Sequence, residues 1–270
     1  MIKLIALDTD GTLLNSNGKI LPSTKAAVAK ALQAGIKVVL CSGRPIAGLK
    51  HFMDELGITG PDQYAVTLNG AITRDADGKM LTADLVNNYF YRKMTAFGKE
   101  HHVPFNIVDP DSRIITADRD IDFIELVQAW ENTAGMFVRE PDELPDDFEI
   151  SKGCFVGNPK MLDEIEPAVR AEFGGDLYVV RADPHFLEVL NPKVSKGNGL
   201  QELGEKINIK PEEMMAFGDA GNDISMFETV GLSVCMGNGT DEAKAAADHV
   251  TADNDSDGIA LAIDKYVFNC

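Results

Sequence analysis

The chain has 270 residues and is strongly acidic, with 43 Asp and Glu against 25 Lys and Arg and a formal net charge of −18. A hydrophobic content of 44% and a charged content of 25% are typical of a globular protein with one large domain or two smaller ones. The acid excess argues against nucleic acid and anionic membranes as partners, because it would repel both, and no apolar run approaches the roughly 18 residues of a membrane-spanning helix.

The first 83 residues alternate short apolar runs with helix-like segments. Strands are predicted at 3–7, 36–40 and 64–68, with one helix at 22–35 and another that ends near residue 56. The strands are apolar throughout, which is typical of parallel strands buried on both faces. This β-α-β-α-β order predicts a doubly wound, Rossmann-like α/β domain with a mostly parallel sheet.

The region 84–190 has strands and helices that do not strictly alternate. Helices are predicted at 85–101, 121–131 and 159–173, strands at 105–108, 113–116, 150–156, 177–181 and 186–190, and an acidic connector at 140–147. Alternation then returns, with strands at 214–217 and 232–235 and helices at 196–207, from 222, after 235 and from 258. We therefore predict a core domain made of 1–83 and 191–270, with an α+β cap domain inserted at 84–190.

Acidic residues follow two predicted core strands, in the segments DTDGT (8–12) and GDAGND (218–223). Ligands bind at the carboxyl ends of the strands in open α/β sheets, and carboxylates gathered there are costly without a cation. Oxygen ligands of this kind suit Mg²⁺. Simpler interpretations remain open: the first segment can be a polar turn, and Asn222 or Asp223 can cap the next helix.

Two further segments offer groups that bind phosphate. Ser42, Gly43 and Arg44 follow the second strand and supply a hydroxyl, a flexible backbone amide and a guanidinium, although Arg44-Pro45 is also a reasonable helix start. Lys196 opens the first helix after the insert, where a lysine opposes the helix dipole. A solvated surface lysine is the alternative for Lys196.

In this order, DxDGT, SGR, the lysine after a long insert and GDxxND resemble the four motifs of the haloacid dehalogenase superfamily of phosphotransferases. The resemblance covers the whole chain, and the insert is similar to the type II cap of that superfamily. The segments LIALDTDGTLL, SGRP, LNGA, FLEVLNPKVSKG and MAFGDAGNDISMF look like those of the Cof-like, type IIB sugar phosphatases, in particular the YidA-like group.

The resemblance implies a mechanism with two carboxylates. Asp8 is expected to attack phosphorus and form an aspartyl-phosphate, which divides one displacement into two easier ones. Asp10 is expected to protonate the leaving oxygen and then to deprotonate the attacking water. The cofactor is expected to be Mg²⁺, held by Asp8, the backbone carbonyl of Asp10 and Asp219, with Asp223 binding directly or through water.

The phosphate ligands are implied in the same way. Ser42, the Gly43 amide and Lys196 are expected to bind the phosphoryl oxygens and stabilise their charge in the transition state. Asn222 is expected to orient the phosphate or a ligand carboxylate. Arg44 and Asn69 are expected to line the entrance.

The function predicted is Mg²⁺-dependent hydrolysis of small phosphorylated metabolites, with hexose phosphates favoured. A phosphomutase on the same scaffold, a phospho-accepting signalling module similar to receiver domains, and a catalytically inactive binding protein are the alternatives. Asp10 discriminates the hydrolase from the signalling module. A hydrolase needs an acid/base beside the nucleophile, whereas a switch needs an acyl-phosphate that persists. The cap is expected to open and close over the substrate, with Glu188 and His185 as candidates for selectivity.

The remaining reactive side chains are assigned structural roles. The adjacent His101 and His102 do not face the same way on a helix and are not expected to bind a metal. Cys41 is expected to be an inert, buried thiol at the end of an apolar strand. The four scattered cysteines and the lack of signal-peptide features predict reduced thiols in a cytoplasmic protein.

Overall fold

The structure, a computed structural model, describes residues 1–269, without the side chains of Ala182 and Asp183. The chain divides into two compact units, each described here by itself. The core unit contains Met1–Gly43, Leu49–Ala83 and the chain from Ser195 onward, and the insert unit contains Arg44–Gly48 and Asp84–Val194.

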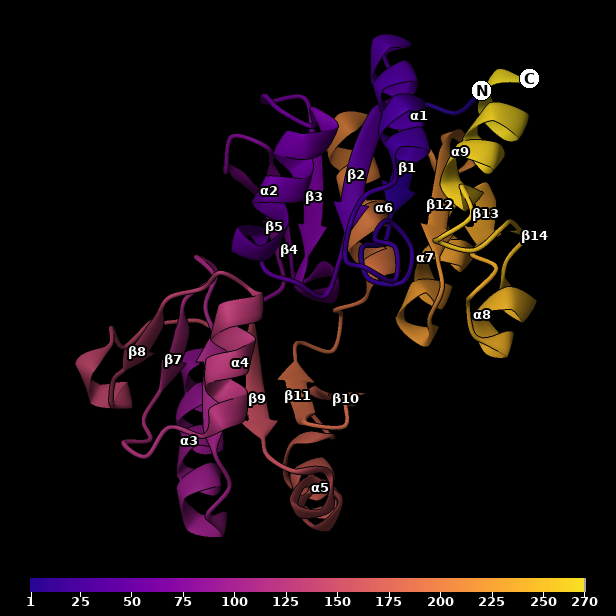
Figure 1. The fold of residues 1–270 in the computed structure, drawn as a ribbon. Helices are drawn as coiled ribbons and strands as arrows, with labels where there is room; N and C mark the ends of the chain where they lie inside the picture. Colours follow the sequence, from indigo (N-terminus) through magenta and orange to yellow (C-terminus); the bar gives the residue numbers. More distant parts are fainter. Residues whose placement is uncertain (270) are drawn as a thin grey trace. The chain divides into compact units, whose positions relative to one another are not determined.

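The core unit is built on an eight-stranded sheet in the order β14-β13-β12-β1-β2-β3-β4-β5 (Figure 1). In this order the strands are His249–Val250, Leu232–Cys235, Met214–Gly218, Leu4–Leu7, Lys37–Cys41, Tyr64–Thr67, Ile72–Asp75 and Met80–Ala83. The pairs β3–β4 and β4–β5 are antiparallel, and all other pairs are parallel. Every residue of β1, β3 and β12 is buried, as expected for strands covered on both faces.

The helices of the core unit are α1 (Pro22–Gln33), α2 (Ile46–Leu56, whose first three residues belong to the insert unit), α6 (Lys196–Ile207), α7 (Ile224–Thr229), α8 (Asp241–Ala246) and α9 (Gly258–Ile263), which continues as a π-helix over Asp264–Phe268. Each of them except the last, α9, precedes a parallel strand of this sheet in the chain. Leu200 and Leu203 of α6 and Phe227 of α7 pack with Leu4 and Ala6 of β1 in one apolar cluster. This packing fixes the amino end of α6 relative to the central strand.

The strand register places the ends of the central strands side by side. Leu7 of β1 is paired with Phe217 of β12 on one side and with Leu40 of β2 on the other. Asp8 therefore follows β1 next to the ends of both neighbours, and its backbone N–H donates to Phe217 O at 3.0 Å. Because these strands are parallel, the residues after each of them share one edge of the sheet.

The insert unit has a six-stranded sheet in the order β10-β11-β9-β6-β7-β8, antiparallel except for β7–β8. In this order the strands are Tyr178–Asp183, Phe186–Leu190, Lys152–Val156, Phe105–Val108, Ile114–Thr116 and Met136–Val138, and the helices are α3 (Asn88–His101), α4 (Phe123–Glu131) and α5 (Pro159–Phe173). One sheet face packs against α3 and α5 through apolar residues that include Met94, Phe105, Phe155 and Phe173.

The opposite face of the insert sheet is polar. Asn106 of β6 donates from Nδ2 to Glu125 Oε1 at 3.2 Å and to Gln128 Oε1 at 2.9 Å, both on α4. On the neighbouring strands, Lys152 and Glu188 form a buried ion pair. The inward face of α4 is therefore held mainly by hydrogen bonds rather than by apolar packing.

The predicted fold class, a doubly wound, mostly parallel core with an inserted α+β unit, is confirmed. The antiparallel hairpin β4–β5 was not predicted, although its turn contains Asp77-Gly78, a common hairpin signal. Strands β8 and β14, of three and two residues, were also missed. Helix α3 begins later than predicted because Asn87 caps it, accepting a hydrogen bond from Phe90 N. The connector at 140–147 contains the 3-10 turn Pro141–Glu143.

Replacing Phe155 with Ala should destabilise the insert unit by about 3–5 kcal/mol, because the ring is fully buried among Phe97, Phe105 and Phe173 and its loss leaves a cavity. Urea unfolding followed by circular dichroism measures this. The matched control is Phe123→Ala in the same unit, whose ring is 73% exposed and whose loss should change the free energy of unfolding by less than about 0.5 kcal/mol. Equal effects of the two variants would contradict the packing described.

Candidate active site

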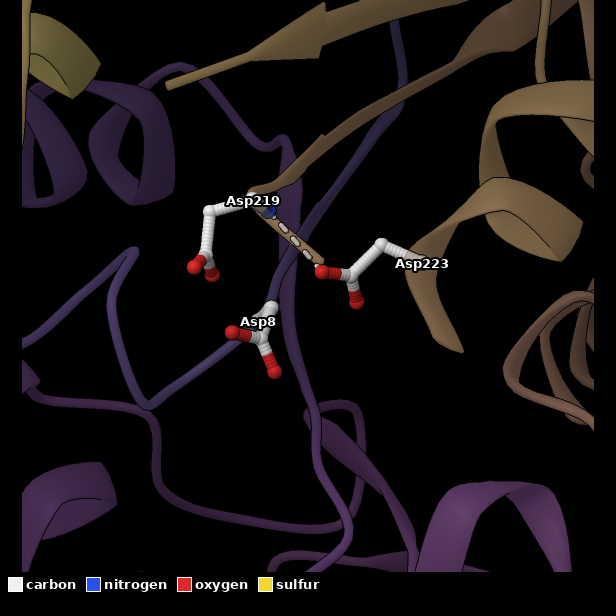
Figure 2. Close-up of side chains that lie close together, drawn as sticks. All are labelled: Asp8, Asp219 and Asp223. Carbon is white, nitrogen blue, oxygen red and sulfur yellow. Dashed lines mark hydrogen bonds between the residues drawn. The ribbon is translucent and has the colours of Figure 1, made fainter. Parts of the chain in front are cut away.

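Three carboxylates converge at the carboxyl ends of β1 and β12. Asp8 directly follows β1, Asp219 directly follows β12, and Asp223 ends the 3-10 turn Gly221–Asp223. One oxygen from each lies within 4.8 Å of those of the other two, and the side chains point toward a shared space (Figure 2). The sequence prediction that these strand ends form an acidic cluster agrees with this arrangement.

Lys196 is the cation that compensates this cluster. Its Nζ lies 2.5 Å from Asp8 Oδ1 and 2.7 Å from Asp223 Oδ1, and the side chain is 1% exposed. Burial by itself lowers the pKa of Lys196, but the carboxylates of Asp8 and Asp223 raise it above its usual value. Lys196 is therefore a buried ammonium ion, and the alternative of a solvated surface lysine is wrong.

The position of Lys196 is set by close backbone contacts. It is the first residue of α6, whose N-cap Ser195 accepts a hydrogen bond from Asn198 N at 3.0 Å. Gly70 has φ +101°, and a Cβ there would collide with the carbonyl oxygen of Ser195. The turn after β3 thus approaches the start of α6 more closely than any other residue would allow.

Asp223 braces the turn that carries Asp219. Its Oδ2 accepts hydrogen bonds from Asp219 N at 2.9 Å and from Ala220 N at 3.0 Å, while its Oδ1 accepts from Lys196. It makes no side-chain cap to the following helix α7. It does close the capping box of the 3-10 turn Gly221–Asp223, which runs into α7, so the predicted cap describes part of its role and the ion pair with Lys196 describes the rest.

The DTDGT turn holds the opposite side of Asp219. Thr12 Oγ1 donates to Asp219 Oδ1 at 2.9 Å. Gly11 has φ +81°, and a Cβ on it would collide with the Asp219 carboxylate, while its carbonyl accepts from Asn238 Nδ2 at 2.8 Å. Neither Thr12 nor Asn238 was predicted to belong to the site. The motif itself pointed to Thr12, but Asn238 lies in an irregular loop with no comparable signal.

Burial raises the pKa of Asp8 to about 8, against the opposing effect of Lys196, and the charges of Asp223 and Asp219 add to the rise. Burial also raises the pKa of Asp219, opposed by the hydrogen bond from Thr12 and assisted by Asp223. Burial is thus the main reason that both carboxyl groups have raised pKa values, and repulsion between the carboxylates adds to it. A dication placed among them would favour their ionised forms.

The predicted phosphate-binding residues surround the turn after β3. Ser42 is buried, and its carbonyl accepts from Asn69 N at 2.9 Å. Asn69 has φ +57° and accepts from Asn222 Nδ2 at 3.2 Å. A Cβ on Gly43 would lie 3.2 Å from Asn69 Oδ1, so Gly43 also approaches this side chain closely. Ser42, Gly43 and Asn222 thus meet through Asn69, which sequence analysis placed only at the entrance.

Two predicted residues lie apart from the carboxylate cluster. The side chain of Asp10 is not among the three clustered carboxylates, and the residue is exposed in the turn after β1, bridged to Leu14. Arg44 belongs to the insert unit, where its Nη1 donates to the Glu131 carbonyl at 3.3 Å. A role for the Asp10 backbone carbonyl as a metal ligand stays a prediction.

The other reactive side chains lie in the following surroundings, and the predicted role of His185 in selectivity stays a prediction. The ring of His101 packs against that of Phe97 in a tilted arrangement, and His102 ends α3 in the left-handed conformation. His185 Nδ1 lies 2.9 Å from the Gly157 carbonyl. Cys41, Cys154 and Cys235 are buried free thiols, and Cys270 lies outside the described residues. Burial raises the pKa of Cys41 well above its usual range, so the predicted inert thiol is confirmed.

The carboxylate cluster fits a magnesium ion in its chemistry. Asp8, Asp219 and Asp223 offer only oxygen donors, their combined charge when ionised exceeds that of Lys196, and burial raises the pKa of Asp8 and Asp219. Hard dications such as Mg²⁺ take few carboxylates and keep several waters. The three residues are therefore the ones that would hold Mg²⁺.

The sequence profile of the haloacid dehalogenase-like hydrolases matches residues 5–263, a span that includes both acidic segments. The chain belongs to this family. Phosphatase YwpJ of Bacillus subtilis is 31% identical to it over 283 residues, which cover 96% of this chain and 98% of YwpJ. This confirms the predicted Cof-like hydrolase and its enzyme class, a phosphoric monoester hydrolase.

Two solved structures of the family have the same fold. A haloacid dehalogenase-like hydrolase from Bacteroides thetaiotaomicron has a TM-score of 0.88 and 29% identity, covering 98% of this chain and 99% of that one. The subclass IIB sugar phosphatase BT4131 has a TM-score of 0.77 and 27% identity, covering 98% and 99%. Among the described residues of this family member, no helix is long and apolar enough to cross a membrane.

Magnesium should raise the melting temperature, and more so at pH 8.5 than at pH 6.5. At 100 times its Kd a ligand adds about 2.7 kcal/mol, or roughly 5–10 °C for a chain of this size. The pKa of Asp8 is about 8 without metal, so below pH 8 the site holds a proton that the cation must displace. Binding therefore weakens as the pH falls.

Thermal unfolding with and without MgCl₂ measures this shift. Asp219→Asn should remove most of it, whereas the control Glu228→Gln, an exposed acid on α7 outside the cluster, should keep it. A shift that survives in Asp219→Asn would place the ion elsewhere.

Proposed function

We propose that the protein is a Mg²⁺-dependent phosphatase that hydrolyses small phosphorylated metabolites, sugar phosphates foremost, through an aspartyl-phosphate on Asp8. The observation that carries this proposal is the position of Asp8: a buried carboxylate at the strand end, paired with Lys196 and facing Asp219 and Asp223. When bound, Mg²⁺ would screen the charge between the nucleophile and the anionic phosphate.

In the first step a carboxylate oxygen of Asp8 forms a bond to phosphorus while the bond to the leaving oxygen breaks. Asp10 gives its proton to that oxygen, so the product leaves as an alcohol. Lys196 and the backbone and hydroxyl groups of Ser42 and Gly43 donate to the phosphoryl oxygens as their charge develops. The buried ammonium of Lys196 is already in place, which avoids reorganisation during the reaction.

In the second step water attacks the aspartyl-phosphate. Asp10, now ionised, takes a proton from the water, the bond between phosphorus and Asp8 breaks, and inorganic phosphate leaves. The exposed position of Asp10 in the turn after β1 suits a group that exchanges protons with both substrate and solvent. After the second step, Asp8 is free of phosphate and Asp10 is protonated again, so the enzyme is regenerated.

We propose in addition that the insert, 84–190, is the cap that selects the substrate, with the core formed by 1–83 and 191–270. Residues 84–190 carry 22 acidic and 10 basic side chains, which disfavours polyanions such as nucleic acid. A cytoplasmic, reducing setting accords with the free thiols of Cys41, Cys154 and Cys235. A phosphomutase shares the chemistry at Asp8 and remains the second candidate.

Asp8→Asn should abolish turnover of p-nitrophenyl phosphate, because the amide is neither a nucleophile nor a good magnesium ligand. A colorimetric assay with MgCl₂ measures this, and EDTA should silence the unmodified enzyme equally. Circular dichroism serves as the control for folding, since Lys196 keeps its partner Asp223. Magnesium-dependent turnover by Asp8→Asn would refute the assignment of the nucleophile.

Asp10→Asn should slow turnover by about 10²–10⁴-fold while the phosphoenzyme accumulates, because p-nitrophenolate leaves without an acid but the hydrolytic step loses its base. Acid quenching and intact-protein mass spectrometry detect the phosphorylated chain. The double variant Asp8→Asn/Asp10→Asn is the control and should carry no phosphate. A phosphoenzyme that is long-lived already in the unmodified protein would favour the signalling module instead.

A further inference from the structure

Helix α4 presents an apolar face to solvent. Phe123, Leu126 and Trp130 are 73%, 49% and 81% exposed and lie at i, i+3 and i+7, on one side of the helix. Its inward side carries Glu125 and Gln128, both buried. Trp130, the only tryptophan of the chain, is thus a large apolar side chain left in water, which is typical of a binding surface.

Trp130 lines a pocket of about 430 Å³ together with Arg44, Glu131 and Thr133, all within the insert unit. This volume is within the roughly 300–1,000 Å³ of small-molecule sites. The lining combines one aromatic ring with a cation, a carboxylate and a hydroxyl. Such a set suits a ligand that has both an apolar ring face and hydroxyl groups, rather than a purely apolar one.

The segment Arg44–Gly48 is attached to this pocket by several contacts. Arg44 Nη1 donates to the Glu131 carbonyl at 3.3 Å, at the carboxyl end of α4 where the helix dipole favours a cation. Ala47 N donates to Ser112 Oγ at 3.4 Å, and a Cβ on Gly48 would lie 3.4 Å from Asn132 Oδ1. The segment is therefore anchored to the part of the insert unit that carries Trp130.

Covalent continuity links the pocket to the phosphate-binding residues. Arg44 is two residues from Ser42, so their Cα atoms are at most about 7 Å apart whatever the arrangement of the two units. Arg44 therefore joins the pocket to the predicted phosphate ligands Ser42 and Gly43 through the chain itself.

From this juxtaposition we propose that Trp130 is a substrate-binding residue that stacks on the ring of a cyclic, hydroxylated phosphate monoester, with Glu131 accepting hydrogen bonds from its hydroxyl groups. The proposal rests on the proposed phosphatase function and deepens it by naming the residue that selects ring substrates. The C–H face of a sugar ring is apolar and fits the indole, while its edge carries the donors that a carboxylate accepts.

The test compares a ring substrate with one that cannot reach the pocket. The probes are glucose 6-phosphate and ribose 5-phosphate on one side, and acetyl phosphate, which has neither ring nor hydroxyl groups, on the other. Trp130→Ala should raise KM for the better ring substrate about tenfold with little change in kcat, and lower its kcat/KM relative to acetyl phosphate by a similar factor. Trp130→Phe, which keeps an aromatic face, should recover most of the loss.

Phe123→Ala is the matched control, because it removes an exposed aromatic from the same helix outside the pocket, and its kinetics should equal those of the unmodified enzyme. In the Asp8→Asn protein, the emission of the single tryptophan should change saturably with the better ring substrate. Equal kinetics for Trp130→Ala and Phe123→Ala, or turnover of acetyl phosphate but of neither ring phosphate, would overturn the inference and leave the phosphatase intact. Turnover of none of the three would refute the proposed function itself.

Discussion

The buried ion pairs of Lys196 with Asp8 and Asp223 are the constraint on which the rest of the core depends. An ammonium ion and carboxylates removed from water are costly unless they compensate each other closely, and breaking such a pair costs about 3–5 kcal/mol. The surrounding backbone serves this requirement. Gly70 allows the start of α6 to approach, and Asp223 uses its second oxygen to fix the turn after β12. Rigidity at this edge of the sheet is thus a consequence of burying charge.

The three carboxylates outnumber the single lysine, so the site carries a net negative charge when all of them are ionised. One cation serves three acids, and burial raises the pKa of Asp8 and Asp219. The site is consequently held together by its ion pairs but lacks positive charge. Under the proposed function, a dication would supply that charge and allow an anionic substrate to bind beside it. In that case the same edge is acidic without a metal and would attract phosphate with one. An acidic protein can therefore act on an anionic substrate without a basic surface.

The motif residues could be located from sequence because their positions follow from local rules. Short apolar runs ending in Asp8 and Asp219 must reach the same sheet edge if their strands are parallel and adjacent, and the register of β1 with β12 does this. Thr12 and Asn238 were missed because their roles depend on contacts across more than 200 residues of chain. The hairpin β4–β5 was missed because its strands are short and half-polar. Trp130 was missed for a different reason: a helix with its polar side buried and its apolar side exposed reverses the usual pattern.

The pairing of β1 with β12 has a consequence for how the chain is made. Asp8 is synthesised early, whereas its lysine and its neighbouring strand follow only after the whole insert has left the ribosome. Until then β1 is an apolar strand with an unpaired edge and an uncompensated carboxylate at its end. The insert unit is compact and consists mainly of Asp84–Val194, so it can fold first. The edge that carries Asp8 therefore forms only late, and a chain that ends before Lys196 has a folded insert but no charge-balanced centre.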